Sequence, residues 1–299
     1  MKLSITLFVL SSLLGLSFLQ SSVAHEIPDS YEFKVILKNS QFFSVKDGIK
    51  ILSVKDGIKN FQKVLRQKKN VVFKGERKDK SRVISFLDTK KCHLKKNGYI
   101  LRKRFTMKDD IPVDLKITLK YRGSEFDVVR KNKFAANTTL LVDSKFELDL
   151  VKDEVFSRSV NVELGKFEDI SDLISLYPII KNLEKDGKPK INEVTEKLEQ
   201  VHEFNIFETK VDLGKIKFTD KKKCEASFTF WYKDLEKKEL MVSEFSYVCK
   251  KDLPQSKDLH QTILGLSEWV EAKPITKTET AYGRYSKDSK DSQYCKKNQ

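Results

Sequence analysis

The chain has 299 residues, of which 39% are apolar and 34% charged, and this balance is typical of a globular protein that can bury a core. Its formal net charge of +15 favours polyanionic partners, namely nucleic acid, phosphate chains, sulfated glycans or an anionic membrane. No two cysteines are spaced as C-x-x-C, and the 11 glycines are isolated. The sequence therefore argues against a zinc or redox site and against a glycine-rich phosphate loop.

The N-terminus has the organisation of a secretory signal peptide. Lys2 precedes an apolar run from Leu3 to Leu19, and small residues follow up to Ala24, as in a cleaved signal. The alternative is an uncleaved anchor, but the run is at the short limit of what spans a bilayer and lacks a flanking basic stop. We expect a signal peptide over residues 1–24 and a mature protein without a transmembrane segment, secreted or in the lumen of the secretory pathway.

Alternation of apolar and charged residues predicts strands along the first part of the mature chain. The predicted strands are 31–37, 71–73, 82–86, 99–105, 115–121, 145–151 and 159–164. A tandem copy interrupts this series, since Ser44–Lys50 and Ser53–Lys59 have the same seven residues, SVKDGIK. Two copies are too few for a solenoid, so we expect a local duplication in a loop or at a helix start, followed by a short basic helix over 60–69.

The second part of the mature chain begins with a helical pattern. Apolar residues at helical spacing predict helices between Phe167 and Phe204, separated by a breaker at 186–189. Strands are predicted again at 208–218, 226–232 and 240–249, and a last helix at 259–270. Two strand-rich parts joined by helices predict a closed or nearly closed barrel with helices outside, and the polar residues 286–299 form a C-terminal tail.

Charged residues alternate along several predicted strands, so that they share one face of each strand. The residues that share faces are Glu32 with Lys34, Arg102 with Arg104, Lys116 with Lys120, and Lys145 with Glu147 and Asp149. One interpretation is an ordinary solvated face. The other is a barrel whose charged faces enclose a polar lumen, where basic residues bind a phosphate chain and carboxylates hold Mg²⁺ or Mn²⁺ against it.

Several short motifs occur in a fixed order along the mature chain. They are Glu32-Phe33-Lys34, Phe86-Leu87-Asp88-Thr89, the set Leu94, Gly98, Leu101, Arg102 and Arg104, then Lys116–Lys120, Lys145–Asp149, Glu244 and Lys277. In this order they resemble the CYTH domain of the triphosphate tunnel enzymes, which include inorganic triphosphatases, thiamine triphosphatases and class IV adenylate cyclases. The Leu-Arg-x-Arg segment is the most specific of these motifs.

The resemblance implies a fold and a set of site residues. The fold is α+β, an antiparallel eight-stranded tunnel-like β-barrel with flanking helices, here over residues 25–285. The implied substrate-binding residues are Lys34, Arg102, Arg104, Lys116, Lys120, Lys145 and Lys277. The implied ligands of Mg²⁺ or Mn²⁺ are Glu32, Glu147, Asp149 and Glu244, and the implied catalytic residues are Glu32, Lys34, Glu147 and Glu244.

Two function classes follow. The first is a secreted protein that binds a triphosphate-containing compound or polyphosphate, and whether it also hydrolyses this ligand by metal-assisted phosphoryl transfer to water stays open. The second is a non-catalytic polyanion-binding module that has lost its metal site, which is favoured by Ser30 and Ser246 at positions where the family has Glu. A copper brace at a new N-terminal His25 is a third class, but nothing else in the sequence resembles the enzymes that use one.

Four cysteines in an exported chain favour two disulfides. Cys224 and Cys249 flank successive predicted strands, so we expect these two to pair, which leaves Cys92 to pair with Cys295. Asn137 begins an N-x-T triplet and is a candidate glycosylation site.

Overall fold

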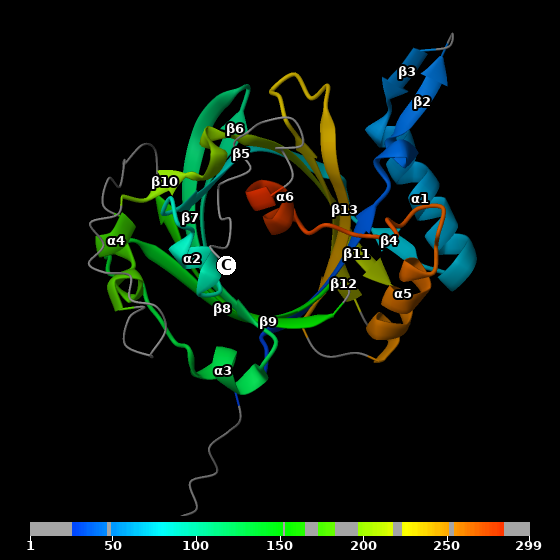
Figure 1. Ribbon diagram of the computed structural model, residues 1–299. Helices are drawn as coiled ribbons and strands as arrows, with labels where there is room; N and C mark the ends of the chain where they lie inside the picture. The colour runs from blue at the N-terminus through cyan, green and yellow to red at the C-terminus, as the bar shows by residue number, and fades with distance from the viewer. Residues whose placement is uncertain are drawn as a thin grey trace, which may run out of the picture.

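The structure is a computed structural model that describes residues 26–46, 49–151, 153–164, 173–182, 197–217, 223–250 and 254–283. Within these residues the chain forms a closed β-barrel with helices around it and one helix inside it (Figure 1). The strand order around the barrel is β5-β6-β7-β9-β8-β1-β13-β12-β11, and β11 pairs back onto β5. The fold is therefore α+β, as the sequence predicted.

The barrel strands are β1 (Ser30–Leu37), β5 (Lys78–Asp88), β6 (Tyr99–Lys108), β7 (Ile111–Gly123), β8 (Leu141–Leu150), β9 (Glu154–Leu164), β11 (Ile206–Lys217), β12 (Lys223–Tyr232) and β13 (Leu240–Cys249). The short strands β2 (Phe43–Lys46), β3 (Ile49–Leu52), β4 (Val72–Lys74) and β10 (Glu199–Gln200) lie outside this ring. The helices are α1 (Val54–Lys69), α2 (His93–Lys96), α3 (Phe126–Lys131), α4 (Leu173–Leu176), α5 (Pro254–Leu264) and α6 (Lys277–Gly283), with 3-10 turns η1 (Asn39–Phe42), η2 (Pro178–Asn182) and η4 (Val201–Glu203).

The expectation of eight antiparallel strands was wrong in both respects. Nine of the described strands close the ring, and β1 runs parallel to β8 while it runs antiparallel to β13. The two differences have one cause. Strands that alternate in direction around a closed ring must be even in number, so a ring of nine needs at least one parallel pair. That pair forms where the N-terminal strand β1 lies between β8 and β13.

The outer face of the barrel is apolar and is covered by helices. On one side, Phe33 of β1 belongs to a cluster with Phe61 of α1 and Ile263 of α5. On another side, Leu119 of β7 belongs to a second cluster with Val129 of α3. Because side chains alternate across a strand, the burial of these residues on the outside turns the charged residues between them toward the lumen. Figure 1 shows α1 and α5 on one side of the ring and α3 and α4 on the other.

A third apolar cluster lies inside the barrel and fills one end of the lumen. It is formed by inward-facing residues of five strands and by α6, namely Ile36, Ile84, Phe86, Ile206, Trp231, Val242, Ala281 and Tyr282. The view along the barrel in Figure 1 shows α6 within the ring of strands. The Tyr282 hydroxyl lies 3.3 Å from a carboxylate oxygen of buried Asp88, to which it donates. The polar part of the lumen is therefore bounded at this end by α6.

The helical pattern predicted between Phe167 and Phe204 is wrong over residues 197–204. Among the described residues of this segment, α4, η2 and η4 are short, and Glu199–Gln200 forms strand β10. β10 pairs with the last residues of β5, which gives their backbone groups hydrogen-bond partners. The apolar Leu198 packs on the outer cluster of the barrel, so its spacing reflects contact with the core rather than a helix.

The last predicted helix, 259–270, is α5, which begins earlier, at Pro254, and ends at Leu264. Beyond it the chain joins the edge of β1. The backbone N–H of Lys38 donates to the carbonyl of Trp269, and the N–H of Glu271 donates to the carbonyl of Ile36. These backbone hydrogen bonds replace those of a longer helix.

The two copies of SVKDGIK adopt different structures. The first copy contributes to β2 and β3. The second forms the start of α1, where the Ser53 hydroxyl donates to Asp56 at 2.5 Å, and the helix thus begins before the predicted 60–69. A Cβ atom on Gly57 would lie 2.5 Å from Cδ1 of Phe42, so the glycine of the second copy allows α1 to pack closely on η1.

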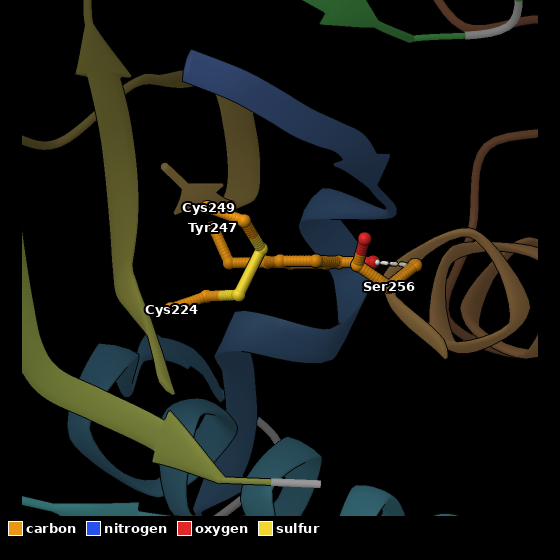
Figure 2. The surroundings of a disulfide bond; sticks show 4 residues. All are labelled: Cys224, Tyr247, Cys249 and Ser256. Carbon is orange, nitrogen blue, oxygen red and sulfur yellow. Dashed lines mark hydrogen bonds between the residues drawn. A yellow bond between two sulfur atoms is a disulfide. The ribbon is translucent and has the colours of Figure 1, made fainter. Parts of the chain in front are cut away.

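Cys224 of β12 and Cys249 of β13 form a disulfide (Figure 2). It joins the start of one strand to the end of the next. Beside it, the Tyr247 hydroxyl donates to the carbonyl oxygen of Ser256 in α5 at 2.6 Å. The disulfide thus joins β12 to β13, and the hydrogen bond holds α5 against β13.

Several predictions concern residues outside the described part of the chain. The signal peptide 1–24, the tail 286–299 and Cys295 lie there, so secretion and the pairing of buried Cys92 with Cys295 stay predictions. Asn137 is exposed in the segment between α3 and β8, and its glycosylation also stays a prediction. None of the described helices combines the length and the apolar character needed to cross a membrane.

Removal of the disulfide should destabilise the barrel. The bond closes a sequence separation of 25 residues, for which the chain-entropy model gives about 3 kcal/mol. We expect the double variant Cys224→Ala, Cys249→Ala to lose about this much free energy of unfolding in urea titrations. A variant as stable as the wild type would contradict the prediction, and the reduced wild type serves as the matched control.

Candidate anion-binding chamber

The charged residues predicted to share strand faces converge on the polar part of the lumen. We call this region the charged chamber. Its lining residues come from β1, β5, β6, β7, β8, β11 and β13, and they are Glu32, Lys34, Arg82, Arg102, Arg104, Lys116, Lys120, Arg122, Glu147, Asp149, Glu208 and Glu244. They lie at alternate positions of their strands, and strand neighbours such as Phe33, Leu119 and Leu148 pack on the outer clusters.

Asp149 is the most enclosed carboxylate of the charged chamber. Its side chain is fully buried, and it accepts hydrogen bonds from Lys34 Nζ at 2.8 Å, Lys120 Nζ at 2.9 Å, Arg122 Nη2 at 2.8 Å and Ser157 Oγ at 3.2 Å. Burial raises the pKa of Asp149, but the three cations outweigh burial and hold its pKa well below the ordinary value. Asp149 is therefore ionised, and four strands, β1, β7, β8 and β9, meet at its carboxylate.

Three carboxylates form an acidic cluster in the charged chamber. One oxygen each from Glu32, Glu147 and Asp149 lie within 4.8 Å of one another, and carboxylate oxygens are the ligands that Mg²⁺ and Mn²⁺ prefer. The cluster is already neutralised, because Lys34 lies 2.8 Å from Glu32 as well as from Asp149. Lys120 lies 3.6 Å from Glu147. The donor type fits a divalent ion, but while these contacts persist the cluster does not offer one an open site.

A second network surrounds Glu208 of β11. Glu208 accepts from Arg82 Nη1 and from Trp231 Nε1, both at 2.9 Å. Burial raises the pKa of Glu208, but the charges of Lys277 and Arg82 outweigh it and lower the pKa to about 2. On the neighbouring wall, Glu244 pairs with Lys277 of α6 at 2.7 Å. This network connects the charged chamber to the helix that fills one end of the lumen.

Arg102 and Arg104 are the basic residues of the charged chamber that remain without a carboxylate partner among the described residues. The Nε atom of Arg102 is buried and has no hydrogen-bond partner there, and the same is true of Nε of Arg82 and of Arg122. Burial and the neighbouring charges of Arg102 and Arg82 lower the pKa of Arg104 to about 9. Positive charge that is desolvated and unpaired in this way is stabilised by an anion.

The remaining predicted site residues lie farther from the acidic cluster. Lys116 pairs at 2.5 Å with the exposed Glu163, and Lys145 is exposed and lies 3.6 Å from Asp143. Lys277 is on α6 and reaches Glu244. The structure thus brings Glu32, Lys34, Lys120, Glu147 and Asp149 into contact, whereas Glu244 belongs to the network that includes α6 and does not join the acidic cluster.

The two serines at positions where the CYTH-like motifs would have Glu form hydrogen bonds through their hydroxyl groups. Ser30 Oγ donates to Glu147 at 3.2 Å. The hydroxyl of Ser246 lies 3.3 Å from that of Ser227, and both residues are buried. Neither position supplies a carboxylate to the charged chamber, so the part of the wall formed by β12 and β13 near Ser246 is polar but uncharged.

Sequence analysis missed three charged residues of the chamber, Arg82, Arg122 and Glu208. Arg122 continues the alternation of Lys116 and Lys120 by one further step on β7, and this signal was present in the sequence. Arg82 and Glu208 are opposite each other in the register of β5 and β11. That pairing closes the barrel and joins strands that are far apart in the sequence.

No protein-family model matches this chain. No curated protein matches it either. Among solved structures, it is similar to a putative adenylyl cyclase from Hippeastrum that is described as having a dominant triphosphatase activity, at 12% identity and a TM-score of 0.43, over 84% of this chain and 93% of that one.

It is also similar to a putative adenylate cyclase from Bacillus halodurans, at 13% identity and a TM-score of 0.43, over 85% of this chain and 97% of that one. A protein from Pyrococcus horikoshii matches at 11% identity and a TM-score of 0.33, over 82% and 94% of the two chains. At these values the similarity assigns no activity to this chain.

The low pKa of Glu208 predicts a stability loss in acid. A carboxyl group whose pKa is lowered on folding stabilises the protein fully above its unfolded pKa, and this stabilisation is lost as the pH falls through the folded value. For Glu208 the window runs from the ordinary 4.5 down to about 2. We expect the free energy of unfolding to fall across this window, and to fall less steeply in Glu208→Gln, which is less stable at neutral pH.

Urea titrations at several pH values test this prediction. The matched control is Glu236→Gln, because Glu236 is exposed and its ion-pair partner Lys238 is exposed as well. Equal slopes for the wild type and Glu208→Gln would contradict the expectation that the Glu208 network contributes to stability in this pH range.

Proposed function

We propose that the charged chamber binds a triphosphate-containing compound or a polyphosphate chain, and that the protein does so as a secreted protein. The observation that carries the proposal is the pair Arg102 and Arg104. Both guanidinium groups face the lumen without a carboxylate partner among the described residues, and Nε of Arg102 is buried without a hydrogen-bond partner. Phosphate oxygens are the acceptors that guanidinium groups match best.

The shape of the site favours a linear phosphate chain over larger polyanions. An anion that reaches Arg102 and Arg104 must enter the lumen of a barrel, which admits a slender ligand. Successive phosphates can then contact the basic side chains of β5, β6 and β7, among them Arg82, Lys120 and Arg122. The motifs that resemble the CYTH domain supply most of these residues, which supports the same ligand class.

Removal of the unpaired guanidinium groups should weaken ligand binding. We expect Arg102→Ala with Arg104→Ala to lower the affinity for tripolyphosphate by more than about tenfold, because hydrogen bonds to charged groups contribute roughly 1.5–3 kcal/mol each. Isothermal titration calorimetry in EDTA measures this change without metal ions. The matched control is Lys103→Ala, since Lys103 lies between the two arginines on the opposite face of β6.

Two outcomes of this titration would count against the proposal. The proposed function is wrong if the wild type fails to bind tripolyphosphate, polyphosphate of greater length and nucleoside triphosphates. If Lys103→Ala loses as much affinity as the double arginine variant, binding takes place on the outer surface and not in the charged chamber.

Hydrolysis is the second candidate function, and the acidic cluster of Glu32, Glu147 and Asp149 favours it. A divalent ion such as Mg²⁺ or Mn²⁺ would neutralise phosphate charge when bound. Arg102 and Arg104 would hold the phosphate chain of the ligand. For a metal to reach the cluster, Lys34 and Lys120 would first have to leave Asp149.

Phosphate release from tripolyphosphate, with and without Mg²⁺ or Mn²⁺, tests this candidate. If hydrolysis takes place, we expect Glu147→Ala to abolish it while tripolyphosphate binding in EDTA is kept. If the wild type binds but releases no phosphate, we expect Ser30→Glu with Ser246→Glu to introduce metal-dependent release. Metal-independent release by the wild type would contradict both expectations.

A further inference from the structure

We propose that Lys34, Lys120 and Arg122 act as permanent counter-ions of the acidic cluster in the place of a divalent metal, so that the charged chamber excludes Mg²⁺ and Mn²⁺ and binds its polyanion without them. This inference deepens the proposed function, because it assigns a metal-independent binding mode to the same chamber. It can nevertheless be tested with no phosphate ligand present.

The first argument is the hydrogen-bonding capacity of Asp149. An ionised carboxylate offers about four acceptor positions on its two oxygens. Lys120, Arg122 and Ser157 donate to its Oδ2 and Lys34 donates to its Oδ1, at distances of 2.8 to 3.2 Å. A metal ion that took Oδ2 of Asp149 would have to displace at least one of these donors, and one that took Oδ1 would lie beside the ammonium group of Lys34.

The second argument is the charge balance of the cluster. Three carboxylates face three cations, since Lys34 lies between Glu32 and Asp149 and Lys120 between Asp149 and Glu147. A divalent ion that entered would leave this buried group with a net charge of about +2, and like charges at these separations repel strongly in a low dielectric. The site is therefore electrostatically complete without a metal.

The third argument concerns Ser30 and Ser246, the two positions where additional carboxylates would be needed to hold a metal ion. Ser30 donates a hydrogen bond to Glu147 without adding a charge, and Ser246 contacts Ser227. The lining residues of the chamber include seven basic and five acidic side chains, so acidic residues at these two positions would balance its charge. With serines, the cations in excess are Arg102 and Arg104, so the unbalanced charge of the chamber attracts anions and not metal ions.

The test is a titration of the protein with Mn²⁺ in the absence of any phosphate ligand. Electron paramagnetic resonance measures the concentration of the free ion. We expect the wild type to bind no Mn²⁺ in the charged chamber at millimolar concentrations. Lys34→Met and Lys120→Met each remove one counter-ion, and we expect each variant to bind one Mn²⁺ at least about tenfold more tightly than the wild type, because the cluster then keeps a net negative charge.

The matched control is Lys63→Met, which removes one positive charge from the exposed face of α1 and should leave Mn²⁺ binding unchanged. Stoichiometric Mn²⁺ binding by the wild type that Asp149→Asn abolishes would overturn the inference, and this result needs no lysine variant to fold. The inference would also be overturned if both lysine variants, shown to be folded by circular dichroism, bound Mn²⁺ no more tightly than the wild type.

The result separates this inference from the proposed function. If the wild type binds Mn²⁺ at the cluster and also binds tripolyphosphate in EDTA, the counter-ion assignment is wrong and the proposed function stands. If the wild type excludes Mn²⁺ but binds no phosphate chain in EDTA, a metal-independent polyanion site is ruled out and the inference is overturned together with the proposed function.

Discussion

The rest of the chamber depends on the neutralisation of Asp149. A fully buried carboxylate is costly unless it is paired and hydrogen-bonded, and here its partners come from β1 and β7 while the residue itself is on β8. The same contacts that stabilise the charge also fix the relative positions of these strands. They lie close to the parallel pair of β1 and β8, the one place in the described ring where strand direction does not alternate.

The lumen is divided into regions of different chemistry. Apolar side chains and α6 fill one end, the acidic cluster with its counter-ions lies on the walls of β1, β7 and β8, and the unpaired Arg102 and Arg104 lie on β6. Lys277 connects α6 to Glu244 at the border of the charged region. An anion bound at the arginines would thus lie in an enclosed site whose other charges are already balanced, so its affinity would depend on a few groups.

The helices outside the barrel have a role in this arrangement that is indirect but necessary. Apolar residues such as Phe33 and Leu119 are buried beneath them, and this burial decides which face of each strand is the outer one. With a one-residue change in register, the charged face would point outward. The disulfide between Cys224 and Cys249, next to the contact of Tyr247 with α5, holds one part of this outer layer in place.

Local patterns in the sequence determined the strands and which of their residues share a face. All nine barrel strands overlap predicted strands, and Arg102 and Arg104 were predicted to share a strand face, because period-two alternation is a property of neighbouring residues. Only the tertiary structure decided the rest. The closure of the ring, the parallel pair and the partners of Asp149 depend on strands distant in sequence, and the two copies of SVKDGIK form a hairpin and a helix start because their surroundings differ.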